Sequence, residues 1–104
     1  MDSLKISDLL NAISDDASLD LFRLIALTDG RTEHLKNKMQ ITRKQYYSRI
    51  FKLVRCGLVQ KQDGGHSLTA IGRILYEAQA CIESALDYRR TRADNSLKVA
   101  ESIP

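Results

Sequence analysis

The chain has 104 residues, of which 43% are hydrophobic and 28% are charged, and its formal net charge is +3. These values are typical of one small globular domain and exclude a disordered or low-complexity chain. No apolar run is long enough to span a membrane, and residues 1–10 lack the basic start and apolar block of a signal peptide, so we expect a cytoplasmic protein without membrane partners.

The first thirty residues predict either two short helices or one bent helix. Ser7 is expected to cap the first helical segment, because a serine hydroxyl can accept a bond from a free backbone N–H. The cluster Ser14-Asp15-Asp16 is typical of a second helix start, and Asp29-Gly30 is typical of a helix stop. We treat residues 1–17 as an N-terminal helical extension.

The middle of the chain predicts two helices joined by a short turn. Thr32 is expected to cap a helix that reaches about Met39, and Thr42 is expected to cap a longer helix over residues 43–56. Gly57 follows at the position where a residue in the left-handed conformation commonly ends a helix.

The helix predicted over residues 43–56 has an apolar face and a basic face. Tyr46, Ile50 and Leu53 fall at i, i+4 and i+7, which places them on one side. The opposite side carries Lys44, Ser48, Lys52 and Arg55, and the flank carries Arg43, Tyr47 and Phe51. This pattern suits a core on one side and phosphate groups on the other.

Positive charge is concentrated around this helix. Residues 31–73 carry ten basic and two acidic side chains, whereas residues 1–30 carry two basic and six acidic ones. A basic segment of this kind attracts polyanions such as nucleic acids, although a basic helix face is often only a solvated surface.

A hairpin and a long helix complete the chain. Residues 58–62 and 66–68 predict two short strands around the turn Asp63-Gly64-Gly65. Thr69 is expected to cap a last helix over residues 70–92, whose heptad-like seam predicts a dimer interface of Ile71, Leu75, Ala78, Ile82 and Ala85. Residues 93–104 form a mostly polar tail, for which both fraying and docking remain open.

The order of these elements predicts a mainly α fold with a small β-hairpin (α+β). A basic helix followed by a hairpin is the order in a winged helix-turn-helix, in which the helix enters a DNA groove and the hairpin lies on the backbone. We assign this DNA-binding domain to residues 18–69 and the dimerisation helix to residues 70–92.

Short motifs carry a resemblance to a known family. Ile41-Thr42 precedes the basic helix, Ile50-x-x-Leu53 lies within it, and the hairpin is bounded by Cys56-Gly57-Leu58-Val59 and Leu68-Thr69-Ala70-Ile71-Gly72. In order and spacing they resemble winged-helix transcription regulators of the ArsR/MarR-like type in the version common among archaea. The resemblance implies homodimers that bind two half-sites, and DNA contacts at Thr42, Arg43, Lys44, Tyr47, Ser48 and Arg49.

The residues themselves divide into two roles on double-stranded DNA, base reading and backbone contact. Base reading is expected from the first turns of the basic helix, which insert deepest: Arg43, Lys44, Tyr47 and Ser48. Backbone contacts are expected further along, from Lys52 and Arg55, and on the hairpin from Lys61 and His66, with an exposed bystander as the alternative for His66. Tyr47 is suited to a thymine methyl group, a sugar, or packing under the hairpin.

No enzyme, cofactor or metal site is expected. The chain lacks the GxSxG, HExxH and phosphate-loop motifs, and its two histidines lie on different predicted elements without ligand spacing. Cys56 and Cys81 fit small core or interface residues. The alternatives to a transcription regulator are a low-specificity chromatin or architectural DNA-binding protein of archaeal type and a winged helix that contacts other proteins of the transcription machinery.

Overall fold

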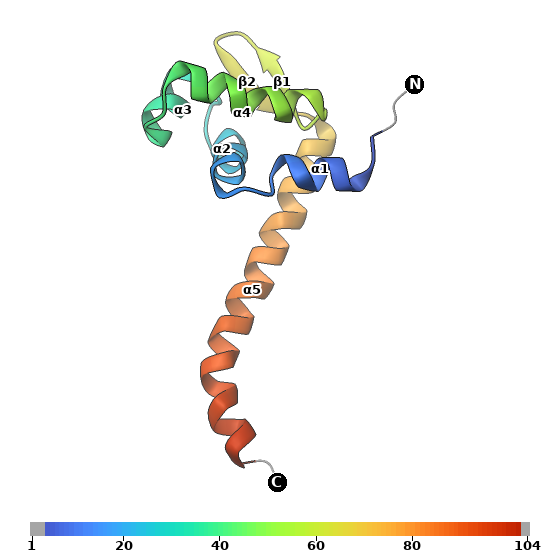
Figure 1. Cartoon of the computed structure of the whole chain (residues 1–104), viewed down its shortest axis with the longest axis vertical. Helices are drawn as coiled ribbons and strands as arrows, with labels where there is room; N and C mark the ends of the chain where they lie inside the picture. The colour runs from blue at the N-terminus through green and yellow to red at the C-terminus, as the bar shows by residue number, and fades with distance from the viewer. Residues whose placement is uncertain (1–3, 103–104) are drawn as a thin grey trace.

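The computed structural model describes residues 4–102, with side chains for residues 4–92. Five helices and one antiparallel hairpin occupy this part of the chain: α1 (Ile6–Ala12), α2 (Asp16–Leu27), α3 (Thr32–Met39), α4 (Arg43–Arg55), β1 (Val59–Gln62), β2 (Gly65–Leu68) and α5 (Ala70–Ser102). The mainly α fold with a small hairpin is therefore confirmed. In Figure 1, α1–α4 and the hairpin form a head from which α5 projects, and the molecule measures 60 × 36 × 20 Å.

The N-terminal region forms two helices rather than one bent helix. The cap predicted for α1 is wrong by two residues, because the helix follows Lys5, whose backbone N–H donates to Asp8 Oδ2 at 2.8 Å, and Ser7 lies inside the first turn. The start predicted for α2 is confirmed: Asp15 is the N-cap and accepts a hydrogen bond from the Ser18 backbone N–H at 3.0 Å.

The start of α4 is fixed by a reciprocal capping box. The Gln45 N–H donates to Thr42 Oγ1 at 3.1 Å, and the Thr42 N–H donates to Gln45 Oε1 at 3.0 Å, so two N–H groups that lack a helical partner are satisfied. The predicted cap is confirmed, and Gly57 after the helix has the expected left-handed φ of 77°. In α3, Thr32 is the first helical residue and not the cap.

The turn of the hairpin is shorter than predicted, and β2 is hydrogen-bonded to the α2–α3 connection. Its register pairs Val59 with Leu68 and Gln62 with Gly65, so Gly65 belongs to β2 and not to the turn. The His66 N–H donates to the Gly30 carbonyl at 2.9 Å. A Cβ at Gly30 would lie 1.8 Å from the His66 carbonyl oxygen, so no larger residue fits this approach between β2 and the α2–α3 connection.

The core lies inside the head, between α2, α3, α4 and the hairpin. Its largest fully buried side chains come from all of these elements: Tyr46, Phe22, Leu21, Leu35, Leu53, Leu58 and Val59. The predicted inner face of α4 is confirmed, since Tyr46, Ile50 and Leu53 are all buried. This face fixes the direction in which the opposite side of α4 points.

Helix α5 begins inside the head and leaves it. Thr69 Oγ1 accepts a hydrogen bond from the Gly72 N–H at 3.1 Å and donates to the Gly57 carbonyl, which confirms Thr69 as the cap. The helix has 33 residues, about 50 Å in length. It continues to Ser102 and so includes most of the segment assigned to a tail, while residues 103–104 lie outside the described residues.

Candidate nucleic-acid interface

The solvent side of α4 carries a row of exposed residues. Lys44, Ser48, Phe51 and Arg55 are all exposed and fall at i, i+4, i+7 and i+11, which aligns them along one side of the helix. We call this row the outer face of α4. Phe51, which the sequence placed on the flank, therefore belongs to this face, whereas Lys52 lies to one side of it near Asp15. Because the inner face of α4 is buried in the core, packing of that face fixes the orientation of the outer face.

Arg43 and Tyr47 lie on the side of α4 that faces the hairpin. The Arg43 guanidinium carbon is 5.7 Å from the centre of the Tyr47 ring, and the Tyr47 ring meets the Tyr46 ring edge to face at 5.1 Å. Both side chains line a cleft of about 250 Å³ together with Lys61 and Thr32. Of the three roles considered for Tyr47, packing beside the hairpin fits this position, although 42% of the residue remains exposed.

The prediction that His66 contacts the DNA backbone is wrong. Only 6% of this residue is exposed, and its Nδ1 is hydrogen-bonded to the Tyr46 hydroxyl at 2.8 Å. The side chain therefore belongs to the core, where it joins β2 to α4, and is neither a phosphate contact nor an exposed bystander. Burial, with a smaller effect from Lys61, holds the pKa of His66 below its usual value, so the neutral ring is favoured.

Burial raises the pKa of Tyr46, the partner of His66 in this hydrogen bond. Both side chains are therefore uncharged at neutral pH. A neutral pair of this kind can stay buried without a counter-ion.

The other cations of the predicted interface differ in whether they already form an ion pair within the chain. Arg55 and Lys61 are exposed, whereas Lys52 Nζ lies 3.5 Å from Asp15 Oδ1 at the start of α2. The pKa of Asp15 is lowered, mainly by the hydrogen bonds that its carboxylate accepts from Ser18 and less by Lys52. An exposed ion pair of this kind contributes little stability, so Lys52 can exchange it for a phosphate at low cost.

Two residues expected only from the family resemblance lie at the edge of this surface. Thr42 is exposed, but its hydroxyl is used in the capping box. Arg49 is half-buried beside the core, and its Nε is buried without a hydrogen-bond partner among the described residues. These positions are therefore less open to a ligand than Lys44 or Ser48.

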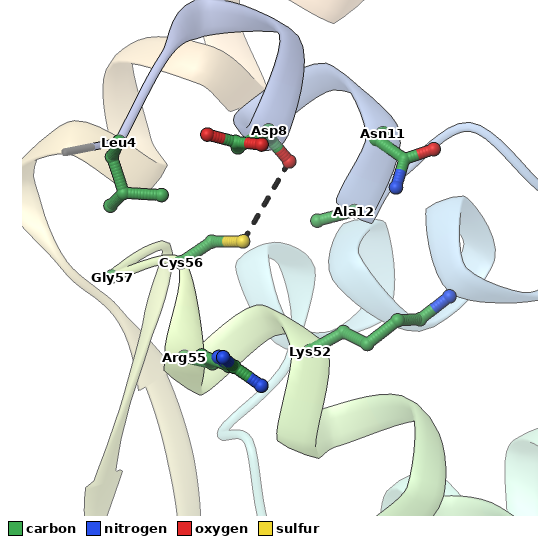
Figure 2. A pocket seen from close by; sticks show the side chains of 8 residues that line it. All are labelled: Leu4, Asp8, Asn11, Ala12, Lys52, Arg55, Cys56 and Gly57. Atoms are coloured by element: carbon green, nitrogen blue, oxygen red, sulfur yellow. Dashed lines mark hydrogen bonds between the residues drawn. The ribbon is translucent and has the colours of Figure 1, made fainter.

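A hollow of about 730 Å³ separates α1 from the end of α4. In Figure 2 its walls are Asp8 and Asn11 on α1 and Lys52, Arg55 and Cys56 at the end of α4. The Cys56 thiol donates a weak hydrogen bond to the Asp8 carbonyl at 3.7 Å. The sequence did not predict this neighbourhood, because nothing in the local pattern links the two segments.

The predicted dimer seam is largely exposed. Ile71, Ala78, Ile82 and Ala85 are exposed, and Leu75 is half-buried against the core. Most of the seam lies in an apolar groove of about 660 Å³ between α1 and the start of α5. The groove also includes residues of α1 and its C-cap that the sequence prediction did not include, among them Ile6, Leu10 and Ile13.

Charged residues border this groove on one side. The Arg23 guanidinium on α2 lies 3.2 Å from Glu83 Oε2 on α5, and Arg23 Nε donates to Gln79 Oε1 at 3.0 Å. These contacts link α5 to α2. Beyond Glu83, every side chain described on α5 is exposed.

Within the part of the chain that the structure describes, no three His, Cys, Asp or Glu side chains come close enough to hold a metal ion. Among the same residues, no helix is both long and apolar enough to cross a membrane. Comparisons with protein-family models, curated proteins and solved structures found no match to this chain.

Proposed function

We propose that this protein is a DNA-binding transcription regulator in which α4 is the recognition helix of a winged helix-turn-helix and the β1–β2 hairpin is the wing. The observation that carries the proposal is the outer face of α4. It is exposed and cationic at both ends, through Lys44 and Arg55, while the inner face is anchored in the core. A helix presented in this way fits the major groove, which admits one α-helix.

Charge supports a duplex as the ligand. The cations that border the outer face come from α4 and from the hairpin, as expected for a surface that follows a phosphate backbone. We assign base contacts to Arg43, Lys44 and Ser48, and phosphate contacts to Lys52, Arg55 and Lys61. Tyr47 supports this surface from the hairpin side.

We further propose that two copies associate through α5, in the cytoplasm where we place the protein. The groove between α1 and α5 leaves large apolar side chains in water, with Ile6 74% and Ile82 65% exposed. A contiguous apolar surface bordered by charged residues is typical of a protein interface. A second α5 offers the same heptad-like seam and is therefore a self-complementary occupant.

Selection of bound sequences from a random duplex pool tests this function. We expect a two-fold symmetric sequence, with half-sites about one helical turn apart. A salt titration then compares the selected duplex with a random duplex of the same length. Both affinities should fall steeply with salt, and the specificity ratio of a regulator should be about 10³ or more.

The length of α5 favours one alternative, a low-specificity architectural DNA-binding protein. A helix of 33 residues that extends well beyond the head can separate two DNA-binding units without any need to read sequence. In that case both duplexes should bind with similar affinity and similar salt dependence. Binding to neither duplex would contradict both DNA-binding functions and would favour protein contacts.

A further inference from the structure

Phe51 is an exposed aromatic residue in the middle of the outer face of α4. It is 61% exposed, although α4 buries three other large side chains on its inner face. Single exposed apolar residues are common on protein surfaces, so the position of Phe51 is more informative than its exposure. Lys44 lies seven residues before it and Arg55 four residues after it on the same side of the helix.

This position differs from that of the other exposed aromatic residue on α4. Tyr47 is in ring contact with both Arg43 and Tyr46 and lines the cleft beside the hairpin. Phe51 has no ring contact of this kind among the described residues and contributes to none of the hollows described above. Its ring is therefore available to an external partner.

We propose that Phe51 is a specificity-determining residue that packs against the C5-methyl group of thymine in the major groove. This inference rests on the proposed DNA-binding function. The thymine methyl is the apolar group at the major-groove edge of the base pairs, and a phenyl ring is a suitable partner for it. Cations at both ends of the outer face place the ring between two points of attachment to the DNA.

The position of Phe51 also constrains how α4 lies on the DNA. The residue is eight positions after the first residue of α4, about 12 Å along the helix axis. A helix that inserted only its first turn would leave this ring outside the groove. Contact at Phe51 therefore requires α4 to lie along the major groove, with Ser48 beside the same base pairs.

Replacement of thymine by deoxyuridine tests the proposal, because it removes the methyl group and keeps the pairing. In a duplex selected from the random pool, each thymine is replaced singly, and binding is measured for the natural protein and for Phe51→Ala. The natural protein should bind about fourfold less tightly when one particular thymine per half-site is replaced, as expected for one methyl group buried from water. Phe51→Ala should not distinguish the two bases there.

Lys44→Ala is the matched control, because it removes a different contact from the same face. This variant should bind more weakly but should still prefer thymine to deoxyuridine at the same position. Equal binding of the two duplexes by the natural protein would overturn the role of Phe51 and leave the DNA-binding function intact. A preference for thymine that persists in Phe51→Ala would also overturn it. Failure to select any duplex would instead contradict the proposed function itself.

Discussion

Helices α4 and α5 are both amphipathic, but their apolar faces have different surroundings. The face of α4 is complete within one chain, because Tyr46, Ile50 and Leu53 pack into the core of the head. The face of α5 is covered only at its start, and Ile74 and Ile82 remain exposed. The same periodic pattern therefore marks a core in one helix and an exposed apolar surface in the other.

This difference separates the two steps of the proposed function. The outer face of α4 is held by the core of the head, against which α5 packs Leu75 and Tyr76. In the proposed dimer, the exposed part of α5 would determine how many heads act together and how far apart they lie. Substitutions in the two apolar faces should consequently have different effects, and that expectation is testable.

The largest effect is expected from a cavity in the α4 face. Leu53→Ala should lower the free energy of unfolding by about 2–5 kcal/mol, because it removes a fully buried side chain from a packed core. Chemical denaturation followed by circular dichroism measures the change. Ile74→Ala is the matched control on α5: measured at a concentration at which the chain is monomeric, loss of this exposed side chain should cost far less. Similar losses for the two variants would remove the difference between the two helices.

The next effect concerns association. Ile82→Glu should convert a dimer to a monomer, because it places a charge in the centre of the apolar seam. Analytical ultracentrifugation at micromolar concentration should show the mass halved. Ser84→Glu adds the same charge at an exposed position away from the seam and should leave the mass unchanged. A natural chain that sediments as a monomer would contradict the dimer assignment.

Local features of the sequence were enough to predict most of the head. Thr42 and Thr69 are confirmed as caps, and Gly57 is confirmed as the left-handed residue after α4, because each depends on neighbours a few residues away. The inner face of α4 follows directly from helical periodicity. These predictions needed no knowledge of the tertiary structure.

The failed prediction at His66 depends on contacts between distant segments. Its burial results from the approach of Gly30 to β2 and from a hydrogen bond to Tyr46, twenty residues away. Alternation along a four-residue strand does not reveal which side is inward. Likewise, the sequence did not show that Ile6 and Ile71 border one groove, because that depends on how α1 packs against α5.

A smaller effect is expected on the solvent side of α4. Lys44→Ala should weaken binding to the selected duplex about tenfold or more, because it removes one direct contact, and should leave the melting temperature unchanged. Fluorescence anisotropy and a thermal melt measure the two quantities. Arg89→Ala removes the same charge from α5 and controls for net charge. A melting temperature lowered by many degrees would show that Lys44 has a structural role.

The smallest effect concerns pH and the link between β2 and α4. Burial lowers the pKa of His66 in the folded chain, so below pH 6.5 the unfolded chain binds a proton more readily than the folded chain does. The free energy of unfolding should therefore fall as the pH decreases from about 7.5 to 5.5. His66→Gln, which keeps a polar group near the Tyr46 hydroxyl, should flatten this fall even if it lowers stability at neutral pH. His34→Gln, at an exposed histidine on α3, is the control and should leave this decrease in the free energy of unfolding unchanged. An equally steep decrease in His66→Gln would show that the buried imidazole is not its source.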